Sequence, residues 1–204
     1  MSDCGCEFTS QTAPERRSLR IALSLNATMF VVGLVAGVVA ESTGLIADSL
    51  DMLADALAYA IGLVAINRSA FFKSRAATLS GTILLLLGIG VLVDVVRRWI
   101  FGASPESEIM LVVASLSLLV NSYVLHLLKR HKGGEVHLQA TWIFTRADVI
   151  ANLAVICSAL FIWFTGWRYI DLIIGTGIGL YVIKEAFEIL KNARSAHDNL
   201  PAAH

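Results

Sequence analysis

The 204-residue sequence has little charge and little cysteine, and each shortage excludes a class of protein. Only 16% of its residues are charged, whereas a soluble domain carries about 25%. Lysine plus arginine equals aspartate plus glutamate, so the net charge of zero favours no binding to nucleic acid. Three scattered cysteines are too few for a disulfide framework. The start of the chain, Met1–Arg20, is polar, so we expect no secretory signal there.

What the chain does contain is apolar sequence: 56% of its residues are hydrophobic, and the mean hydropathy is +0.71. A helix needs about 20 apolar residues to cross a bilayer, and six stretches approach that length. They are Leu19–Ala40, Thr43–Ile66, Ala76–Ile100, Ile109–Leu128, Leu138–Thr165 and Ile170–Leu190. The sequence therefore predicts an all-α, polytopic membrane protein with a bundle of six transmembrane helices.

Basic residues predict the orientation of this bundle, because cytoplasmic loops are enriched in lysine and arginine. With six spans, four basic groups fall on one side: Arg16, Arg17 and Arg20; Arg68, Lys73 and Arg75; Lys129, Arg130 and Lys132; Lys191 and Arg194. The opposite side carries mostly acidic residues: Glu41, Glu106, Glu108 and Asp171. Arg97 and Arg98 are exceptions that Asp94 can neutralise at helical spacing. We expect both termini in the cytoplasm, with tails at 1–18 and 192–204 around a membrane domain at 19–191.

Three aspartates interrupt the second apolar stretch. Asp48, Asp51 and Asp55 are spaced so that they project from one face of a helix. An aspartate at the centre of a membrane helix costs about 3 kcal/mol, so such residues are rare and usually functional. The fifth stretch carries a second polar pair, Asp148 and Asn152, again four residues apart.

The two polar faces are predicted to lie at the same depth in the membrane. Asp55 lies 12 residues before the following polar loop, and Asp148 lies 11 residues after the preceding one. At 1.5 Å per residue, both are roughly 17 Å from the inner boundary, near the midplane. By the same count Asp51 and Asn152 are level, one turn further out. Two antiparallel helices are thus predicted to form one site.

Three neighbouring carboxylates cannot all stay ionised in a low-dielectric interior without a compensating charge. A divalent cation supplies that charge, and protons can replace it when the cation leaves. We therefore predict a metal site in which Asp51, Asp55 and Asp148 are ligands and proton acceptors, with Asn152 as the candidate fourth ligand. Oxygen ligands suit zinc, manganese, iron or cobalt.

Several residues keep more than one interpretation. Buried aspartates can also be protonated donors between helices, and Asn152 can be a hydrogen-bonding residue between helices. The same packing role is expected of Asn121, and Asp48 is either structural or an outer relay. Two glycine pairs, Gly33 with Gly37 and Gly175 with Gly179, indicate either close helix crossings or the general abundance of glycine in membrane helices.

Two segments resemble a known family. STGLIADSLDMLAD at 42–55 is similar to the second helix of the cation diffusion facilitator family, and WIFTRADVIAN at 142–152 is similar to its fifth. The resemblance implies export of divalent metals, chiefly zinc, in exchange for protons, by dimers with alternating access. It also implies a site with two ligands from each helix. Asp51 and Asp55 match the first pair, and Asp148 matches the second member of the other.

The chain departs from the family pattern in two places. Phe144 stands where the family commonly has a histidine or aspartate, so Asn152, Asp48 or water must complete the shell. About a dozen residues follow the sixth stretch, and the family's cytoplasmic C-terminal domain is not in the sequence. We therefore expect any homodimer to form through membrane helices.

These observations predict a multi-pass protein of the bacterial inner membrane that exports a divalent cation against protons. Zinc is the first choice of cation, with cadmium, cobalt, iron and manganese as alternatives; no prosthetic group and no enzyme activity are expected. The partners are the lipid bilayer, the cation and protons.

The rival interpretation is a non-transporting metal-binding or regulatory membrane protein. An intramembrane aspartyl protease is disfavoured because neither Asp55 nor Asp148 has a Gly-x-Gly-Asp context. Cys4, Cys6 and the tail histidines His197 and His204 have no assigned role.

Overall fold

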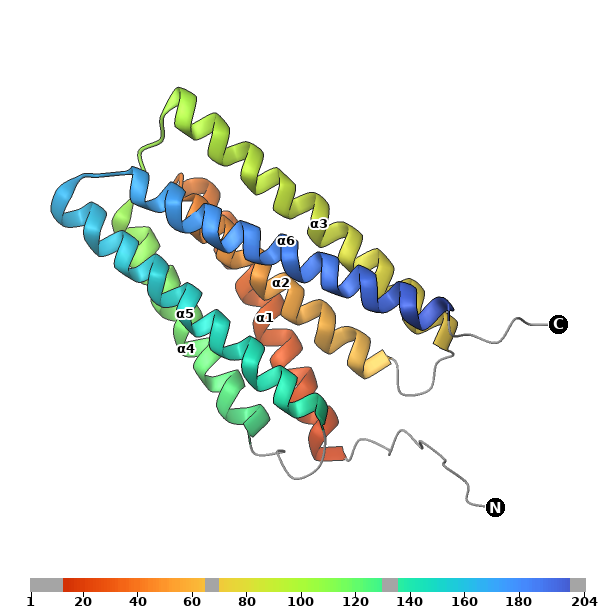
Figure 1. Ribbon diagram of the computed structural model, residues 1–204. Coiled ribbons are helices and arrows are strands. Elements are labelled where there is room, and N and C mark those ends of the chain that lie inside the picture. Colours follow the sequence, from red (N-terminus) through yellow and green to blue (C-terminus); the bar gives the residue numbers. More distant parts are fainter. Residues whose placement is uncertain (1–12, 65–69, 130–135, 199–204) are drawn as a thin grey trace, which may run out of the picture.

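The protein is described by a computed structural model that covers residues 13–64, 70–129 and 136–198. These residues form six helices: α1 (Ala13–Val39), α2 (Thr43–Val64), α3 (Ala70–Phe101), α4 (Ser107–Lys129), α5 (Val136–Thr165) and α6 (Tyr169–Asp198). All six lie roughly along one axis and alternate in direction along the chain (Figure 1). The predicted all-α bundle is confirmed.

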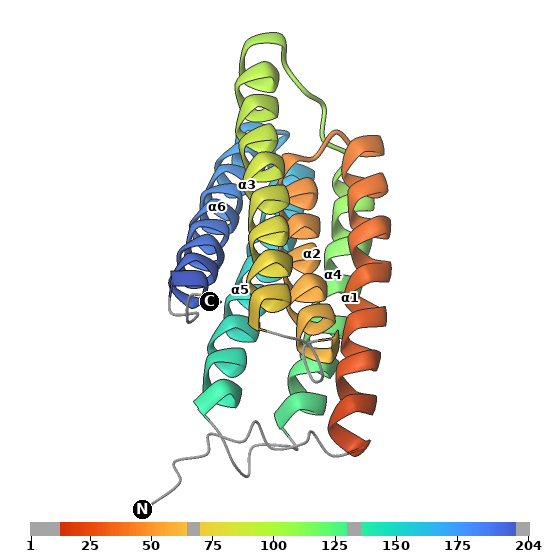
Figure 2. The same cartoon turned by 90° about the vertical axis from the view of Figure 1, so that its right-hand side faces the viewer.

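Helix α2 is the centre of the bundle, because it contacts each of the other five helices. It packs most extensively on α1, while α4 packs on α5 and α3 on α6. Figures 1 and 2 show α3 and α6 as a pair beside the group formed by α1, α2, α4 and α5. The aspartate-bearing helix is therefore enclosed on several sides.

The connections place both ends of the described chain at one end of the bundle. Helix α1 begins and α6 ends at that end, and residues 40–42, 102–106 and 166–168 turn the chain at the opposite end (Figures 1 and 2). This arrangement agrees with an even number of spans. Arg16, Arg17 and Arg20 lie near the start of α1, and Lys191 and Arg194 lie near the end of α6. We therefore call this end the inner end and the opposite end the outer end.

Four of the helices are long and apolar enough to cross a membrane by length and composition: Arg16–Val39, Ser74–Phe101, Ser107–Leu128 and Asp148–Thr165. Helices α2 and α6 do not meet that criterion within the described residues. Both are interrupted by charge, α2 by its three aspartates and α6 by residues such as Lys184, Glu185 and Glu188. Their polar residues therefore require a protein environment rather than lipid.

Glycines allow two close approaches to α2. A Cβ atom added at Gly37 of α1 would lie 2.8 Å from the backbone nitrogen of Ile46, and one at Gly175 of α6 would lie 2.8 Å from the carbonyl carbon of Thr43. No side chain fits at such distances, so these positions bring the helix backbones together. The close-crossing interpretation is confirmed for Gly37 and Gly175, one glycine of each pair.

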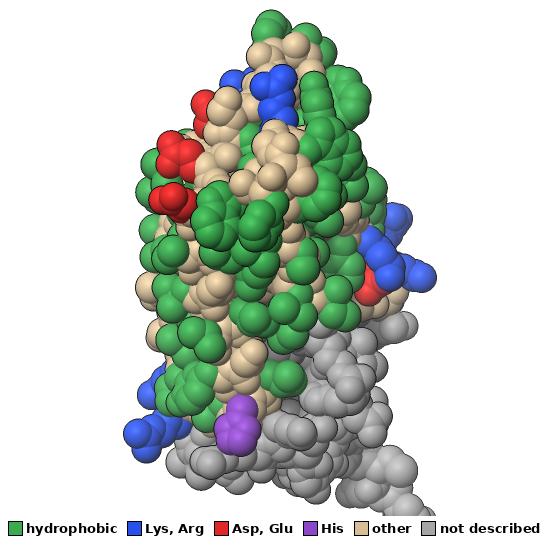
Figure 3. Space-filling model, turned by 90° about the vertical axis from the view of Figure 1, so that its left-hand side faces the viewer, with side chains coloured by type: hydrophobic (Ala, Val, Ile, Leu, Met, Phe, Trp, Pro, Cys, Tyr) green, Lys and Arg blue, Asp and Glu red, His purple; other side chains and the backbone are tan. Residues whose placement is uncertain are grey.

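The sides of the bundle, between its inner and outer ends, are largely apolar, as a lipid-facing surface must be. On α3, the exposed side chains recur every seven residues and thus share one face: Leu79, Leu86, Val93 and Ile100. Figure 3 shows hydrophobic side chains over most of one side of the molecule, with charged groups gathered towards its ends and along one edge. The polar residues of α2 instead face inward, since Asp48 and Asp51 are 2% and 5% exposed.

Candidate cation site

A buried carboxylate at the outer end fixes where α2 begins. Asp171, in the first turn of α6 and 1% exposed, accepts hydrogen bonds at Oδ1 from Ser42 Oγ at 2.7 Å and from the Gly44 amide at 3.1 Å. Its Oδ2 accepts one from the Thr43 amide at 2.7 Å. The next amide, of Leu45, donates to Ser42 Oγ at 3.1 Å. The free amides of the first turn of α2 are thus capped, and negative charge sits at the positive end of the helix.

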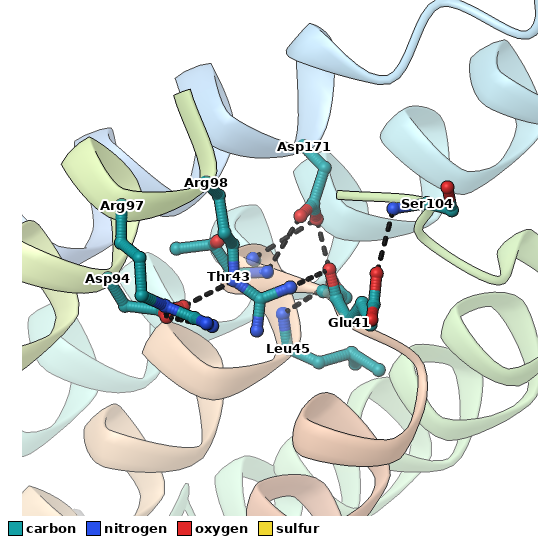
Figure 4. A network of polar contacts seen from close by, with 10 residues as sticks. Glu41, Thr43, Leu45, Asp94, Arg97, Arg98, Ser104 and Asp171 are labelled. Atoms are coloured by element: carbon teal, nitrogen blue, oxygen red, sulfur yellow. Dashed lines mark hydrogen bonds and ion pairs between the residues drawn. The ribbon is translucent and has the colours of Figure 1, made fainter. Parts of the chain in front are cut away.

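Charged groups around this cap connect it to α3 and to the turn at 102–106, as Figure 4 shows. Arg98 of α3 donates to the backbone oxygen of Glu41 and to the carboxylate of Asp94, and Arg97 pairs with the same Asp94 at 2.8 Å. The Glu41 carboxylate accepts from the Ser104 amide at 2.9 Å. The expected neutralisation of Arg97 and Arg98 by Asp94 is confirmed. We call Asp171 with Ser42, Thr43 and Gly44 the outer clamp.

A different set of carboxylates meets near the middle of the bundle. Asp148 of α5, which is 4% exposed, lies within hydrogen-bonding reach of both Asp51 and Asp55 of α2. Asp55 also accepts a long hydrogen bond of 3.4 Å from Tyr59 Oη. Among the described residues, Asp148 Oδ2 is buried and has no hydrogen-bond donor. We call Asp51, Asp55 and Asp148 the central triad.

Asn152 belongs to a separate hydrogen-bonded group next to this triad. Its Nδ2 donates to Asp48 Oδ1, and its Oδ1 accepts from Nδ2 of Asn121 on α4 at 3.2 Å. Ser117 of α4 also hydrogen-bonds Asp48. Asn121 therefore has the expected role between helices. The amide of Asn152 is occupied at both ends, although its carbonyl oxygen keeps a second lone pair.

The register of the two helices differs from the one obtained by counting. Equal depth predicted Asn152 opposite Asp51, but the structure pairs Asn152 with Asp48, three residues earlier. The count treated both helices as upright and level with the loops, whereas packed helices cross at an angle. The meeting of Asp148 with the two other aspartates of the triad tolerates this offset, because Asp51 and Asp55 span a full turn.

Sequence reasoning missed a fourth acidic residue. Glu185 of α6 interacts electrostatically with Asp51, Asp55 and Asp148, and Tyr181 Oη donates to its Oε1 at 3.5 Å. A signal for it exists in the sequence, since Glu185 lies inside the sixth apolar stretch. Lys184 and Glu188 lie in the same part of the stretch, so charge alone does not single out Glu185.

The described side chains do not form a finished metal site. Within residues 13–64, 70–129 and 136–198, no group of three or more His, Cys, Asp and Glu side chains is arranged so that it could hold a metal ion. Several predicted positions lie outside the described parts: Cys4, Cys6 and His204, and the side chains of Phe144 and His197. The ligand roles of Asp51, Asp55, Asp148 and Asn152 stay predictions.

Comparison with known proteins identifies the family. The model of the cation efflux transmembrane domain matches residues 19–196. The chain belongs to the cation efflux family. This confirms the resemblance read from residues 42–55 and 142–152, and it confirms a multi-pass membrane protein rather than an enzyme.

Curated relatives of this cation efflux chain are bacterial. The metal cation efflux system protein CzcD of Cupriavidus metallidurans is 31% identical over 189 residues, which cover 87% of this chain and 60% of the relative. The zinc transporter ZitB of Yersinia pseudotuberculosis is 28% identical over 209 residues, with coverages of 95% and 65%. A cadmium, cobalt and zinc/H(+)-K(+) antiporter of Bacillus velezensis is 20% identical over 126 residues, with coverages of 60% and 40%. The chain thus spans less than two thirds of the length of these relatives, and they agree with the expected bacterial inner membrane.

Proposed function

We propose that this chain transports a divalent cation out of the cytoplasm, with zinc as the first choice and cadmium, cobalt, iron or manganese as alternatives. The observation that carries the proposal is the central triad, in which two buried carboxylates, Asp51 and Asp148, meet the half-buried Asp55. Membership of the cation efflux family supports it, as do the printed names of the relatives CzcD and ZitB.

The chemistry follows from the need to compensate buried negative charge. In the absence of the cation, protons neutralise the triad; when the cation arrives, its charge replaces theirs and the protons leave. Such an exchange couples cation export to proton entry without a separate proton pathway. The side chains must converge further to bind, so we propose that Asp51, Asp55 and Asp148 rotate towards the cation. Asn152 is the proposed fourth ligand, through the free lone pair of its carbonyl oxygen.

Flux through reconstituted vesicles tests this proposal. Purified protein is placed in proteoliposomes with a zinc indicator and a pH dye inside, and zinc is added outside. In wild-type vesicles we expect zinc to enter while protons leave, so that the internal pH rises. Asp51→Ala, Asp55→Ala and Asp148→Ala should give only background signals from both dyes. Glu108→Gln, an exposed change in the first turn of α4, is the control that keeps both signals. Unchanged flux in any of the three triad variants would refute the site.

The rival function, a metal-binding or regulatory membrane protein, predicts a different result in the same vesicles. The wild type would bind zinc at the central triad but move neither zinc nor protons. The favoured proposal requires both movements, with a fixed ratio between them at all zinc gradients.

We also propose a homodimer formed through membrane helices, as the family resemblance implies. The mass of the protein in lipid nanodiscs measures this directly. Two chains per particle at all loading ratios support the dimer, and one chain per particle when discs are in excess contradicts it.

A further inference from the structure

Helix α6 contributes a carboxylate towards the central triad that the predicted ligand set does not include. Glu185 is half-buried and interacts electrostatically with all three members of the triad. Tyr181, one turn earlier on the same helix, donates to its Oε1 at 3.5 Å. Helices α6 and α2 pack against each other, as Figure 1 shows with α6 crossing α2.

The register of α6 against α2 sets the depth of Glu185. Both helices begin at the outer end and run inward, and Gly175 contacts Thr43 at the level where α2 starts. Glu185 lies ten residues after Gly175, or about 15 Å further along the helix. The same distance along α2 from Thr43 reaches Leu53, between Asp51 and Asp55. Glu185 is therefore level with the triad.

The other charged residues in this part of α6 point elsewhere. Lys184 and Glu188 form an ion pair of 3.7 Å, and their side chains are 71% and 51% exposed. Tyr181 and Glu185 are spaced four apart and share a different face, which is the less exposed one. The helix thus separates an exposed ion pair from a half-buried carboxylate on the face nearer α2.

The triad contains a carboxylate oxygen that no protein group satisfies within the described residues. Asp148 Oδ2 is buried and lacks a hydrogen-bond donor within the described residues, although Asp148 is only 4% exposed. The oxygen of Asn152 already accepts from Asn121. Phe144, where the family resemblance expects a ligand, has no atom that binds a metal. A divalent cation such as zinc takes four or more ligands, and a carboxylate from α6 would supply one that does not depend on the hydrogen-bonded amide of Asn152.

We propose that Glu185 is a carboxylate ligand of the transported divalent cation, supplied by α6 and held in position by Tyr181. The inference rests on the proposed function, since it adds a ligand to the same site. It makes the site a meeting point of three helices, α2, α5 and α6, with oxygen ligands throughout. Tyr181 is a positioning residue, because it acts through Glu185.

Cobalt binding to the purified full chain in lipid nanodiscs tests the proposal, because bound Co²⁺ reports its ligands in its visible absorption spectrum. We expect Glu185→Gln to weaken Co²⁺ binding at least about tenfold and to alter the spectrum, since loss of even an outer-shell partner costs a site 10- to 100-fold. Tyr181→Phe should weaken binding less and leave the spectrum unchanged. Glu188→Gln, the matched exposed control, should bind as the wild type does. Thermal unfolding of each variant verifies that it is folded.

The outcomes separate this inference from the proposed function. If the wild type binds Co²⁺ and Glu185→Gln binds it with the same affinity and spectrum, the role of Glu185 is refuted and the triad is unaffected. If Glu185→Gln does not fold, Glu185→Asp replaces it. A shifted spectrum in that variant supports the ligand role, and an unchanged spectrum with unchanged affinity overturns it. If the wild type binds neither Co²⁺ nor Zn²⁺, the proposed function fails, and this inference fails with it.

Discussion

Helix α2 takes part in buried polar interactions at two levels, the outer clamp and the central triad. The two levels differ in whether the carboxylates have hydrogen-bond donors as partners. At the outer clamp, Asp171 accepts three hydrogen bonds from groups that need a partner in any case. At the central triad, Asp51, Asp55 and Asp148 meet mainly one another, and Asp148 Oδ2 has no donor among the described residues. The carboxylate of the clamp is satisfied by the protein's own donors, whereas the triad has the proton or cation of the proposed function as its expected partner.

The difference teaches how to separate structural from functional charge in a membrane bundle. A buried carboxylate with matched donors holds helices together, here α2 to α6. A buried carboxylate next to other carboxylates destabilises the protein unless a proton or cation compensates it. Burial alone does not distinguish the two cases, since Asp171 and Asp148 are 1% and 4% exposed. The identity of the partners does.

The largest expected effect is on transport, from a change in the central triad. Asp148→Asn removes one negative charge while it keeps the shape of the side chain. We expect zinc flux in proteoliposomes to fall to the level of empty vesicles, with the temperature of unfolding equal to or above that of the wild type, because repulsion in the triad is relieved. A large loss of thermal stability with retained flux would contradict this prediction, because it would give the central triad a structural role instead of a functional one.

The next largest effect is on stability, from a change in the outer clamp. Asp171→Ala leaves the amides of Thr43 and Gly44 and the hydroxyl of Ser42 without their acceptor. Each unsatisfied buried group costs about 1–3 kcal/mol, so three of them predict a loss of at least about 3 kcal/mol in the free energy of unfolding. Denaturant titration in detergent measures it. Flux per folded molecule should stay within about twofold, and a complete loss in folded protein contradicts a structural role.

Close packing beside the clamp gives a smaller expected effect. A methyl group at Gly175 would lie 2.8 Å from the backbone of Thr43, so Gly175→Ala must push α6 away from α2. We expect a cost of about 1–3 kcal/mol. Gly177→Ala is the matched control on the same helix, because an added Cβ there meets nothing within 4 Å. Equal stabilities of the two variants would show that the close approach is not needed.

The smallest expected effect concerns the group next to the triad. Asn121→Ala removes the hydrogen bond to Asn152 and frees the Asn152 oxygen. Hydrogen bonds between membrane helices are worth about 0.6 kcal/mol on average, so stability should fall only slightly. If Asn152 is a ligand, zinc affinity should stay equal or rise, because its oxygen no longer competes with another donor. A tenfold fall in zinc affinity would instead place Asn121 in the site.

The sequence predicted the parts that depend on local pattern. Apolar length gave the six helices, and helical spacing placed Asp51 and Asp55 on one face. It did not give the parts that depend on how helices rotate and cross. Asp171 was counted only among the acidic residues of the outer side, yet it is buried in the first turn of α6 and caps α2. Glu185 was overlooked for a related reason: only packing shows that it faces α2 while Glu188 does not.

The unknown crossing of the helices also explains why the partner of Asn152 was predicted wrongly. Counting residues places a side chain in depth to about one turn, but a shift of three residues changes its partner from Asp51 to Asp48. Crossing angles scatter by about 15–20° around their preferred values, and sequence carries no direct signal for them. Contacts between distant helices were therefore predictable as a region of the bundle and not as individual pairs.

Proton release on zinc binding tests the central claim most directly. Purified wild-type protein and Asp148→Asn are titrated with zinc in weakly buffered solution, and released protons are counted with a pH indicator. Compensation of the triad by protons predicts that the wild type releases protons in fixed ratio to bound zinc, and that Asp148→Asn releases fewer or binds no zinc. Zinc binding to both proteins without proton release would contradict the account.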